Sequence, residues 1–128
     1  MTSRDWRKIH ALTEQVRLAA EVSLAQWQRH EAEVTSALSR LDGTAAPELL
    51  EDDVVRRAGA DLRWQAWCDA RRTTLLAELA RIRYRKAAAE EELRHAARRG
   101  IATQAVLRAE ERIEARLNAN RAEREGRS

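Results

Sequence analysis

The chain has 128 residues, of which 35% are charged and only 4% aromatic, and its formal net charge is +3. Phenylalanine is absent, and one Pro and four Gly leave few places for the chain to turn. This composition is typical of long helices and excludes a globular core several layers deep. The single cysteine excludes an intramolecular disulfide and indicates a reducing compartment.

A first helix is predicted over about residues 3–41. Thr2 or Ser3 can cap its start, and Asp5 suits the positive end of the helix dipole. Apolar residues then recur at spacings of three and four, which predicts one continuous apolar face. These residues are Ile9, Leu12, Val16, Ala20, Leu24, Trp27, Val34, Leu38 and Leu41.

The strongest turn signal is LDGTAAPELL, residues 41–50, where Asp-Gly favours a turn and Pro47 suits the first position of a helix. We expect a loop over 42–47, a second helix over about 48–122 and a frayed tail over 123–128. Two helices joined by a short loop form an antiparallel hairpin. The sequence therefore predicts an all-α fold with a single domain over 1–128. That domain is an antiparallel two-helix coiled-coil hairpin whose long C-terminal helix overhangs the shorter N-terminal one.

A turn centred near residue 46 also predicts which residues of the hairpin face each other. Leu38 would face Val54 and Val55. Trp27 would face residues 64–67, and the start of the first helix would face residue 90 or so. About 40 residues of the second helix would then have no intramolecular partner, so this overhang would be marginal, dimeric or waiting for a partner.

Gly100 interrupts the otherwise helical sequence RHAARRGIATQAVL, residues 94–107. Arg98 and Arg99 would suit a helix end, but no proline follows, and Thr103 has no Glu or Gln three residues later for a capping box. Helical periodicity resumes at once. We expect the helix to continue through Gly100, at a cost of about 1 kcal/mol relative to alanine.

No group of residues predicts catalysis, a cofactor or a metal. His10, His30 and His95 are far apart, and His10 with Glu14 one turn later is typical of a surface hydrogen bond. Cys68 has no histidine nearby in sequence and suits a small interior residue. The sequence has no glycine-rich phosphate loop. We therefore predict that the chain is not an enzyme.

The basic run Arg81, Arg83, Arg85 and Lys86 could belong to a nucleic-acid surface. On a helix, however, successive residues point in different directions, and the acidic residues 90–92 follow closely. Lys86 and Glu90 are spaced to form an ion pair. A solvated helix face is the preferred interpretation, and binding of nucleic acid stays an alternative.

Trp64 and Trp67 lie at i and i+3 on one side of the predicted helix, with Arg71 one turn later in reach of a cation–π contact. The two indoles could pack around Trp27 of the first helix. A layer of two helices is thin, so at least one indole would still expose a face to solvent, as residues at protein-binding hot spots do.

The second helix resembles a known family. The segment LRWQAWCDARR is followed by LLAELARIRYRKAAAEEELRHAARRG and then by IATQAVLRAEERIEAR. This order of two spaced aromatics and a long run of small, basic and leucine residues resembles FliJ, the coiled-coil stalk of the bacterial flagellar (type III) export apparatus, and its injectisome counterpart YscO. The resemblance covers about residues 55–118, and the missing phenylalanines depart from it.

The resemblance implies a non-catalytic stalk that inserts its terminal half into a hexameric export ATPase, touches the export gate membrane protein and escorts export chaperones. By position, Arg108, Arg112 and Arg116 would enter the ring, and Trp64, Trp67 and Arg71 would be candidates for the gate contact. The alternatives are a generic coiled-coil scaffold or homodimer, and a basic helical nucleic-acid binder. With no signal-type apolar run and no stretch of about 18 apolar residues, we expect a cytoplasmic protein that is peripheral to the membrane only through partners.

Overall fold

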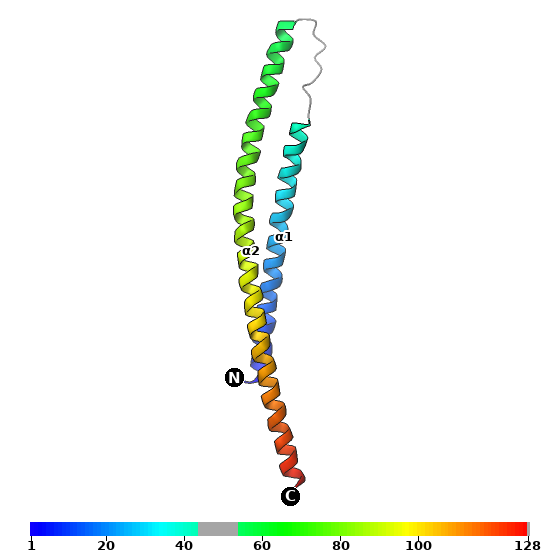
Figure 1. Ribbon diagram of the computed structural model, residues 1–128, viewed down its shortest axis with the longest axis vertical. Coiled ribbons are helices and arrows are strands. Elements are labelled where there is room, and N and C mark those ends of the chain that lie inside the picture. Colours follow the sequence, from blue (N-terminus) through cyan, green and yellow to red (C-terminus); the bar gives the residue numbers. More distant parts are fainter. Residues whose placement is uncertain (44–53, 128) are drawn as a thin grey trace. The chain divides into compact units, whose positions relative to one another are not determined.

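The computed structural model of the chain describes residues 1–43 and 54–127. Helix α1 spans Ser3–Asp42 and helix α2 spans Val54–Gly126, and no strand occurs in the described ranges (Figure 1). The two helices pack on each other, which confirms the predicted all-α helical hairpin. The predicted turn, with Pro47 at the first position of a helix, lies outside the described residues.

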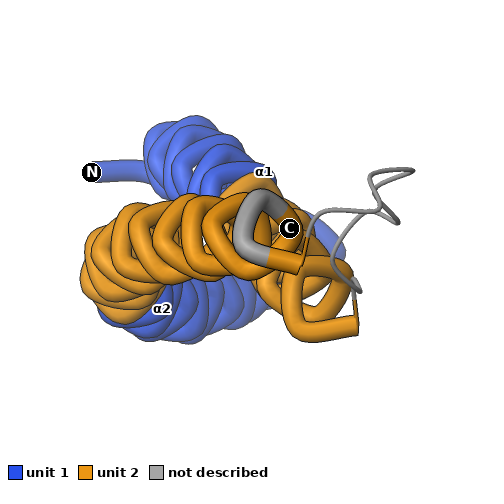
Figure 2. Tube along the Cα trace, turned by 90° about the horizontal axis from the view of Figure 1, so that it is seen from above, with its two compact units in different colours: residues 1–24, 88–128 blue, residues 25–87 orange. Residues whose placement is uncertain are grey.

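The chain divides into two compact units, each made of one stretch of α1 and one stretch of α2 (Figure 2). The terminal unit comprises Met1–Leu24 and Ala88–Ser128, and the central unit comprises Ala25–Ala87. Each unit has its own packing between the two helices and is described by itself below.

Helix α1 begins with the cap that the sequence predicts. The Thr2 backbone N–H donates to Asp5 Oδ2 at 3.0 Å, and the Asp5 backbone N–H donates to Thr2 Oγ1 at 3.4 Å. This reciprocal pair satisfies backbone donors that a helix start leaves without partners. The hydrogen bonds from Thr2 lower the pKa of Asp5 below its ordinary value.

The central unit contains the apolar core of the hairpin. Val34 of α1 is buried against Leu75, Leu79 and Ile82 of α2. The residues that pack around this cluster from α1 are Trp27, Ala37, Leu38 and Leu41. Two ion pairs fix how the helices face each other here: Lys86 Nζ lies 3.1 Å from Glu31 Oε1, and Arg72 Nη2 lies 2.6 Å from Asp42 Oδ1.

These contacts show that the predicted register is wrong. Leu38 packs with the cluster around Leu79, and Val54, which was predicted to face it, is 76% exposed. In the terminal unit the start of α1 faces Glu114, because the Ser3 backbone N–H donates to Glu114 Oε1 at 2.9 Å. The prediction placed residue 90 or so there, so the true register is displaced by roughly three seven-residue repeats.

The register also corrects the predicted overhang. Only residues 115–126 of α2 follow the contact between Ser3 and Glu114, so most of the segment that was expected to lack a partner is paired with α1. Gly100 is helical as predicted, but it is buried against α1: a Cβ added at Gly100 would lie 2.9 Å from Glu14 Oε1. The glycine marks a close approach of the two helices, in a segment that was predicted to have no intramolecular partner.

In both units the paired residues follow a strict spacing of three and four, the signature of a coiled-coil seam. Each of these residues is buried or half-buried. The central seam consists of Trp27, Glu31, Val34, Leu38 and Leu41 of α1 with Leu75, Leu79, Ile82 and Lys86 of α2. The terminal seam consists of Ser3, Trp6, His10, Thr13, Arg17, Ala20 and Leu24 of α1 with Leu93, Ala96, Gly100, Thr103, Leu107, Glu110 and Glu114 of α2.

Candidate partner-binding surfaces

Trp64 and Trp67 stack on each other in the central unit. Their ring centroids lie 5.2 Å apart with the ring planes at 19°, and Trp67 is 54% exposed. The two indoles were expected to be able to pack around Trp27, but Trp27 packs on the central core with its ring 5.5 Å from that of His30. The exposure of Trp67 confirms that at least one indole shows a face to solvent, and a partner contact there stays a prediction.

A groove of about 250 Å³ runs beside the stacked indoles. One wall is Trp64, Trp67 and Arg71 of α2, so the three residues predicted as one partner site do lie together. The ring contact found there joins the two indoles, and Arg71 is exposed to solvent. The rest of the lining comes from Ala37, Arg40, Leu41 and Leu75.

Arg72 forms two ion pairs on the neighbouring surface of the central unit. Its guanidinium contacts Asp42 at 2.6 Å and Asp69 at 3.2 Å. The hydrogen bond that Arg72 donates to Asp42 raises the pKa of Arg72, with the Asp42 charge as the next cause. Cys68 is half-buried beside these groups as a free thiol, which is the small packing residue that the sequence predicts.

Arg108, Arg112 and Arg116 lie on the exposed side of α2 in the terminal unit. Their spacing of four residues places them along one outward stripe of the helix. Within the described ranges none of the three has an ion-pair partner. Arg108 and Arg112 precede Glu114, however, so they lie where α2 is paired with α1, and the prediction that they occupy an unpaired arm is wrong for both.

The basic run of the central unit is partly used inside the hairpin. Lys86 pairs with Glu31 of α1, instead of the predicted Glu90, and Arg83 Nε lies 3.5 Å from the same carboxylate. The hydrogen bond from Lys86 lowers the pKa of Glu31 below its ordinary value. Two cations of the run therefore serve helix pairing, which removes them from a nucleic-acid surface.

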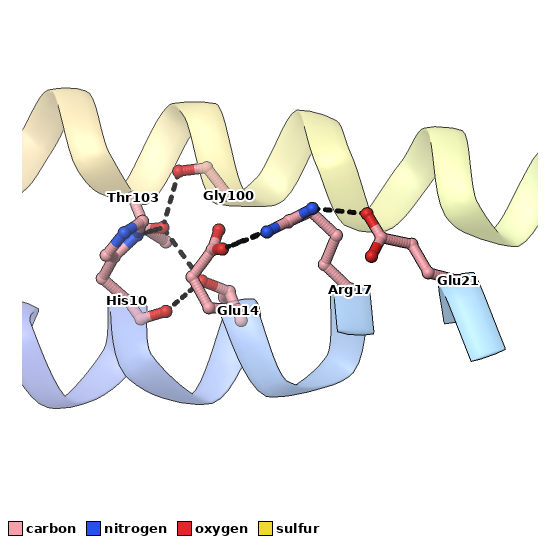
Figure 3. A network of polar contacts seen from close by, with 7 residues as sticks. His10, Glu14, Arg17, Glu21, Gly100 and Thr103 are labelled. Atoms are coloured by element: carbon pink, nitrogen blue, oxygen red, sulfur yellow. Dashed lines mark hydrogen bonds and ion pairs between the residues drawn. The ribbon is translucent and has the colours of Figure 1, made fainter. Parts of the chain in front are cut away.

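The terminal seam is polar where the central seam is apolar. Figure 3 shows its middle, where His10 Nδ1 contacts Thr103 Oγ1 at 2.9 Å. Thr13 Oγ1 contacts the same hydroxyl at 3.1 Å. Thr103 also donates to the Gly100 carbonyl at 3.1 Å. The His10 interaction predicted with Glu14 is replaced by this contact across the helices.

Charged residues flank the same part of the terminal seam. Arg17 lies 2.7 Å from Glu14 and also pairs with Glu21 (Figure 3). The hydrogen bond from Arg17 lowers the pKa of Glu14, and the Glu14 carboxylate raises the pKa of Arg17. At its start the seam is closed by Ser3, whose hydroxyl donates to Glu114 Oε2 at 2.6 Å.

Large apolar side chains lie outside the terminal seam. Leu12, Val16, Leu18 and Val22 of α1 are all at least half exposed. Ile101, Ile113 and Leu117 of α2 are exposed as well. α1 therefore carries large apolar side chains outside its seam, and such exposed apolar groups are typical of surfaces that bind a partner. The predicted place of Leu12 and Val16 in the hairpin interface is wrong, because both side chains are exposed.

A signal for this surface was present in the sequence. From Leu12 to Val16, Ala20 and Leu24 the apolar residues step by four three times in succession. A seam alternates steps of three and four, so successive steps of four carry the apolar stripe out of it. His10, Thr13 and Arg17 take the seam positions instead.

Two neighbouring grooves of the terminal unit are lined by residues of this apolar stripe, and they share Val16, Ala96 and Arg99. One of about 160 Å³ is lined by Ile9, Leu12, Thr13 and Val16 with Ala96 and Arg99. The other, of about 360 Å³, is lined by Val16, Ala19, Ala20 and Ser23 with Glu92, His95, Ala96 and Arg99. We call the second groove the alanine groove.

No protein-family model matches the chain, and neither curated proteins nor solved structures gave a similar protein. The described residues contain no cluster of three or more His, Cys, Asp or Glu side chains able to hold a metal ion. Neither helix, over its described length, offers a segment apolar enough to cross a membrane. The terminal unit offers two candidate surfaces, its exposed apolar face and the stripe of Arg108, Arg112 and Arg116. The central unit offers the groove beside Trp64 and Trp67, here called the tryptophan groove.

Proposed function

We propose that this chain is a non-catalytic interaction protein whose terminal unit is enclosed by a protein partner. The observation that carries the proposal is the polarity of this unit: ten of its fourteen seam residues are polar or small, the exceptions being Trp6, Leu24, Leu93 and Leu107, while Leu12, Val16, Leu18 and Val22 face solvent. A hairpin of this kind gains little stability from its own seam. Burial of the outward side chains by a partner would stabilise it by about 25 cal/mol per Å² of apolar surface.

The resemblance to FliJ and YscO supplies the specific form of the proposal. The partner around the terminal unit is a hexameric export ATPase, and Arg108, Arg112 and Arg116 face its inner surface. The tryptophan groove, with Trp64, Trp67 and Arg71, contacts the export gate, and export chaperones are further partners. On this proposal the protein works in the cytoplasm and reaches the membrane only through its partners.

The arginine stripe gives a test with a matched control. Arg108 and Arg112 are exposed residues one helical turn apart, and so are Arg81 and Arg85 in the central unit. We expect R108E/R112E to weaken binding to the purified export ATPase of the same organism at least tenfold, about 1.4 kcal/mol. R81E/R85E, which reverses the same number of charges at the same spacing, should change binding less than twofold.

Sedimentation of the mixed proteins measures this binding. If the wild-type chain does not associate with the ATPase, the export-stalk proposal fails. If both double variants weaken binding equally, the interaction is a general charge effect and the arginine stripe is not the contact.

The tryptophan groove is tested separately with the cytoplasmic part of the gate protein. W64A/W67A should abolish gate binding while ATPase binding persists, because the two surfaces lie in different units. If binding to both partners survives while the free energy of unfolding falls, the two indoles serve only to pack the central unit.

A further inference from the structure

The alanine groove has a symmetry that points to its occupant. Its lining residues on α1 are Val16, Ala19, Ala20 and Ser23, and those on α2 are Glu92, His95, Ala96 and Arg99. Both sets have the spacing i, i+3, i+4 and i+7, so each set is symmetric about its own midpoint on the helix face. Because both sets line one groove, the two midpoints lie at the same level of the terminal unit.

A two-fold axis can therefore lie across the groove at that level, perpendicular to the helices and running from α1 to α2. Rotation about it places a second hairpin face to face with the first, with α1 antiparallel to α1 and α2 antiparallel to α2. Glu92 of each copy then faces Arg99 of the other, so the interface contains two opposite-charge pairs. Such an interface is isologous, the commonest kind in homodimers.

We propose that the alanine groove is occupied by a second copy of this chain, which forms an antiparallel four-helix bundle with the first. In this bundle every neighbouring pair of helices is antiparallel, the arrangement of up-and-down four-helix bundles. The small side chains of Ala19, Ala20 and Ala96 at the centre let the two hairpins approach closely. Val16, which is 52% exposed in the isolated chain, becomes buried.

The charges of the groove are available for this pairing. Glu92 and Arg99 are both exposed, and neither has an ion-pair partner within the part of the chain that the structure describes. A rotation axis parallel to the helices would instead place Arg99 against Val16 of the second copy and leave both charges without partners. Charge complementarity therefore selects the antiparallel arrangement.

This inference rests on the groove and not on the proposed export partner. A partner that encloses the terminal unit would also cover the alanine groove, so enclosure and this dimer exclude each other. The dimer would bury Val16 and leave Leu18 and Val22 exposed, and binding of an enclosing partner would have to separate the two copies.

The test is the mass of the full chain in solution, measured by sedimentation equilibrium. We expect twice the monomer mass of 14.6 kDa at micromolar concentration. E92R and R99E should each raise the dissociation constant at least tenfold, because each places like charges opposite one another at both ends of the interface. The double variant E92R/R99E should restore the wild-type dissociation constant, since it exchanges the two charges.

Two controls separate the groove from the rest of the surface. R98E reverses the neighbouring exposed charge, which does not line the groove, and should leave the dimer intact. V16E should abolish the dimer whereas L18E should not, although both side chains are 52% exposed. Circular dichroism of each variant checks that the helices form.

A wild-type chain that remains monomeric at about 100 μM overturns the proposal. So does a dimer that E92R and R99E leave unchanged, because its interface would lie elsewhere. Binding of the export ATPase by a strictly monomeric chain would overturn the dimer and leave the proposed function standing. If the dimer forms and is weakened by E92R and R99E but the chain does not bind the ATPase, the dimer proposal stands and the proposed export function fails.

Discussion

The central and terminal units have the same seam spacing of three and four, but they differ in the polarity of the side chains at the seam positions. In the central unit the seam is apolar apart from the pair of Glu31 and Lys86, and its core residues are buried. In the terminal unit the seam contains hydroxyls, a histidine and a glycine, and the large apolar side chains face outward. The spacing of three and four therefore determines which residues lie in the seam, and the side chains at those positions determine how much apolar area the seam buries.

The comparison also explains the sizes of the residues in the terminal seam. Gly100 and Ala96 are both buried where α1 approaches α2. Small residues at these positions bring the two backbones together with little apolar area to bury, so the pairing there depends on polar contacts such as those of Thr103. Each such contact contributes about 1 kcal/mol or less, well below the contribution of a buried leucine.

The largest expected effect distinguishes the two seams directly. Leu75 is 3% exposed in the central core, so L75A should lower the free energy of unfolding by about 2–4 kcal/mol through lost burial and the cavity left behind. L107A makes the same truncation at a half-buried position of the terminal seam, and should cost about 1 kcal/mol. Urea titration monitored by circular dichroism measures both values. Equal losses would show that the terminal seam is as well packed as the central one.

The sequence alone predicts the helices and the hairpin, because these follow from local pattern. The cap of Thr2 and Asp5, the continuity through Gly100 and the placement of Trp64, Trp67 and Arg71 in one surface all depend on residues close together in the chain. Such features depend on the spacing of residues along one helix, which can be read directly from the sequence.

The register could not be predicted from the apolar pattern, because a shift by whole seven-residue repeats leaves the same positions facing the partner helix. The displacement from residue 90 or so to Glu114 is about 24 residues, which is three repeats and one further step of three, and a step of three also leads from one seam position to the next. What selects the register is the match of particular residues, such as Glu31 with Lys86 and Ser3 with Glu114. The lack of an apolar residue at 31 in α1 and at 86 in α2 was a visible sign of one such match.

Gly59 and Gly100 lie in the interior of α2, one in each unit. Replacement by alanine gains up to about 1 kcal/mol in a helix interior. A Cβ at Gly59 has no atom within 4 Å, so G59A in the central unit should gain the full amount. A Cβ at Gly100 would lie 2.9 Å from Glu14 Oε1 and must displace that carboxylate, which weakens its contact with Arg17. G100A should therefore stabilise the chain less than G59A.

Thermal unfolding of the two alanine variants measures the difference. Since the Glu14 side chain ends in a flexible carboxylate, G100A should still fold, and E14Q/G100A should regain part of the missing stabilisation. If G100A equals G59A, the helices can separate at this point without loss, and the close approach in the terminal unit contributes nothing to stability.

The smallest expected effect is the pH dependence of the two carboxylates that join the helices, Glu31 in the central unit and Glu114 in the terminal unit. The pKa of Glu31 is lowered chiefly by the hydrogen bond from Lys86, and that of Glu114 by the hydrogen bonds from Ser3. A carboxylate whose folded pKa lies below its unfolded value stabilises the fold at pH values above the unfolded value. That contribution is lost as the pH falls through the lowered pKa.

Thermal unfolding followed from pH 7 down to about pH 3 separates the two units. E31Q should flatten the acid dependence of the main transition, because Glu31 belongs to the unit that holds the hairpin together. E114Q should change that transition little and instead increase hydrogen exchange of the backbone amides at the start of α1, where Ser3 loses its acceptor. The reverse result, with E114Q dominating the main transition, would mean that the terminal seam stabilises the hairpin as strongly as the central core does.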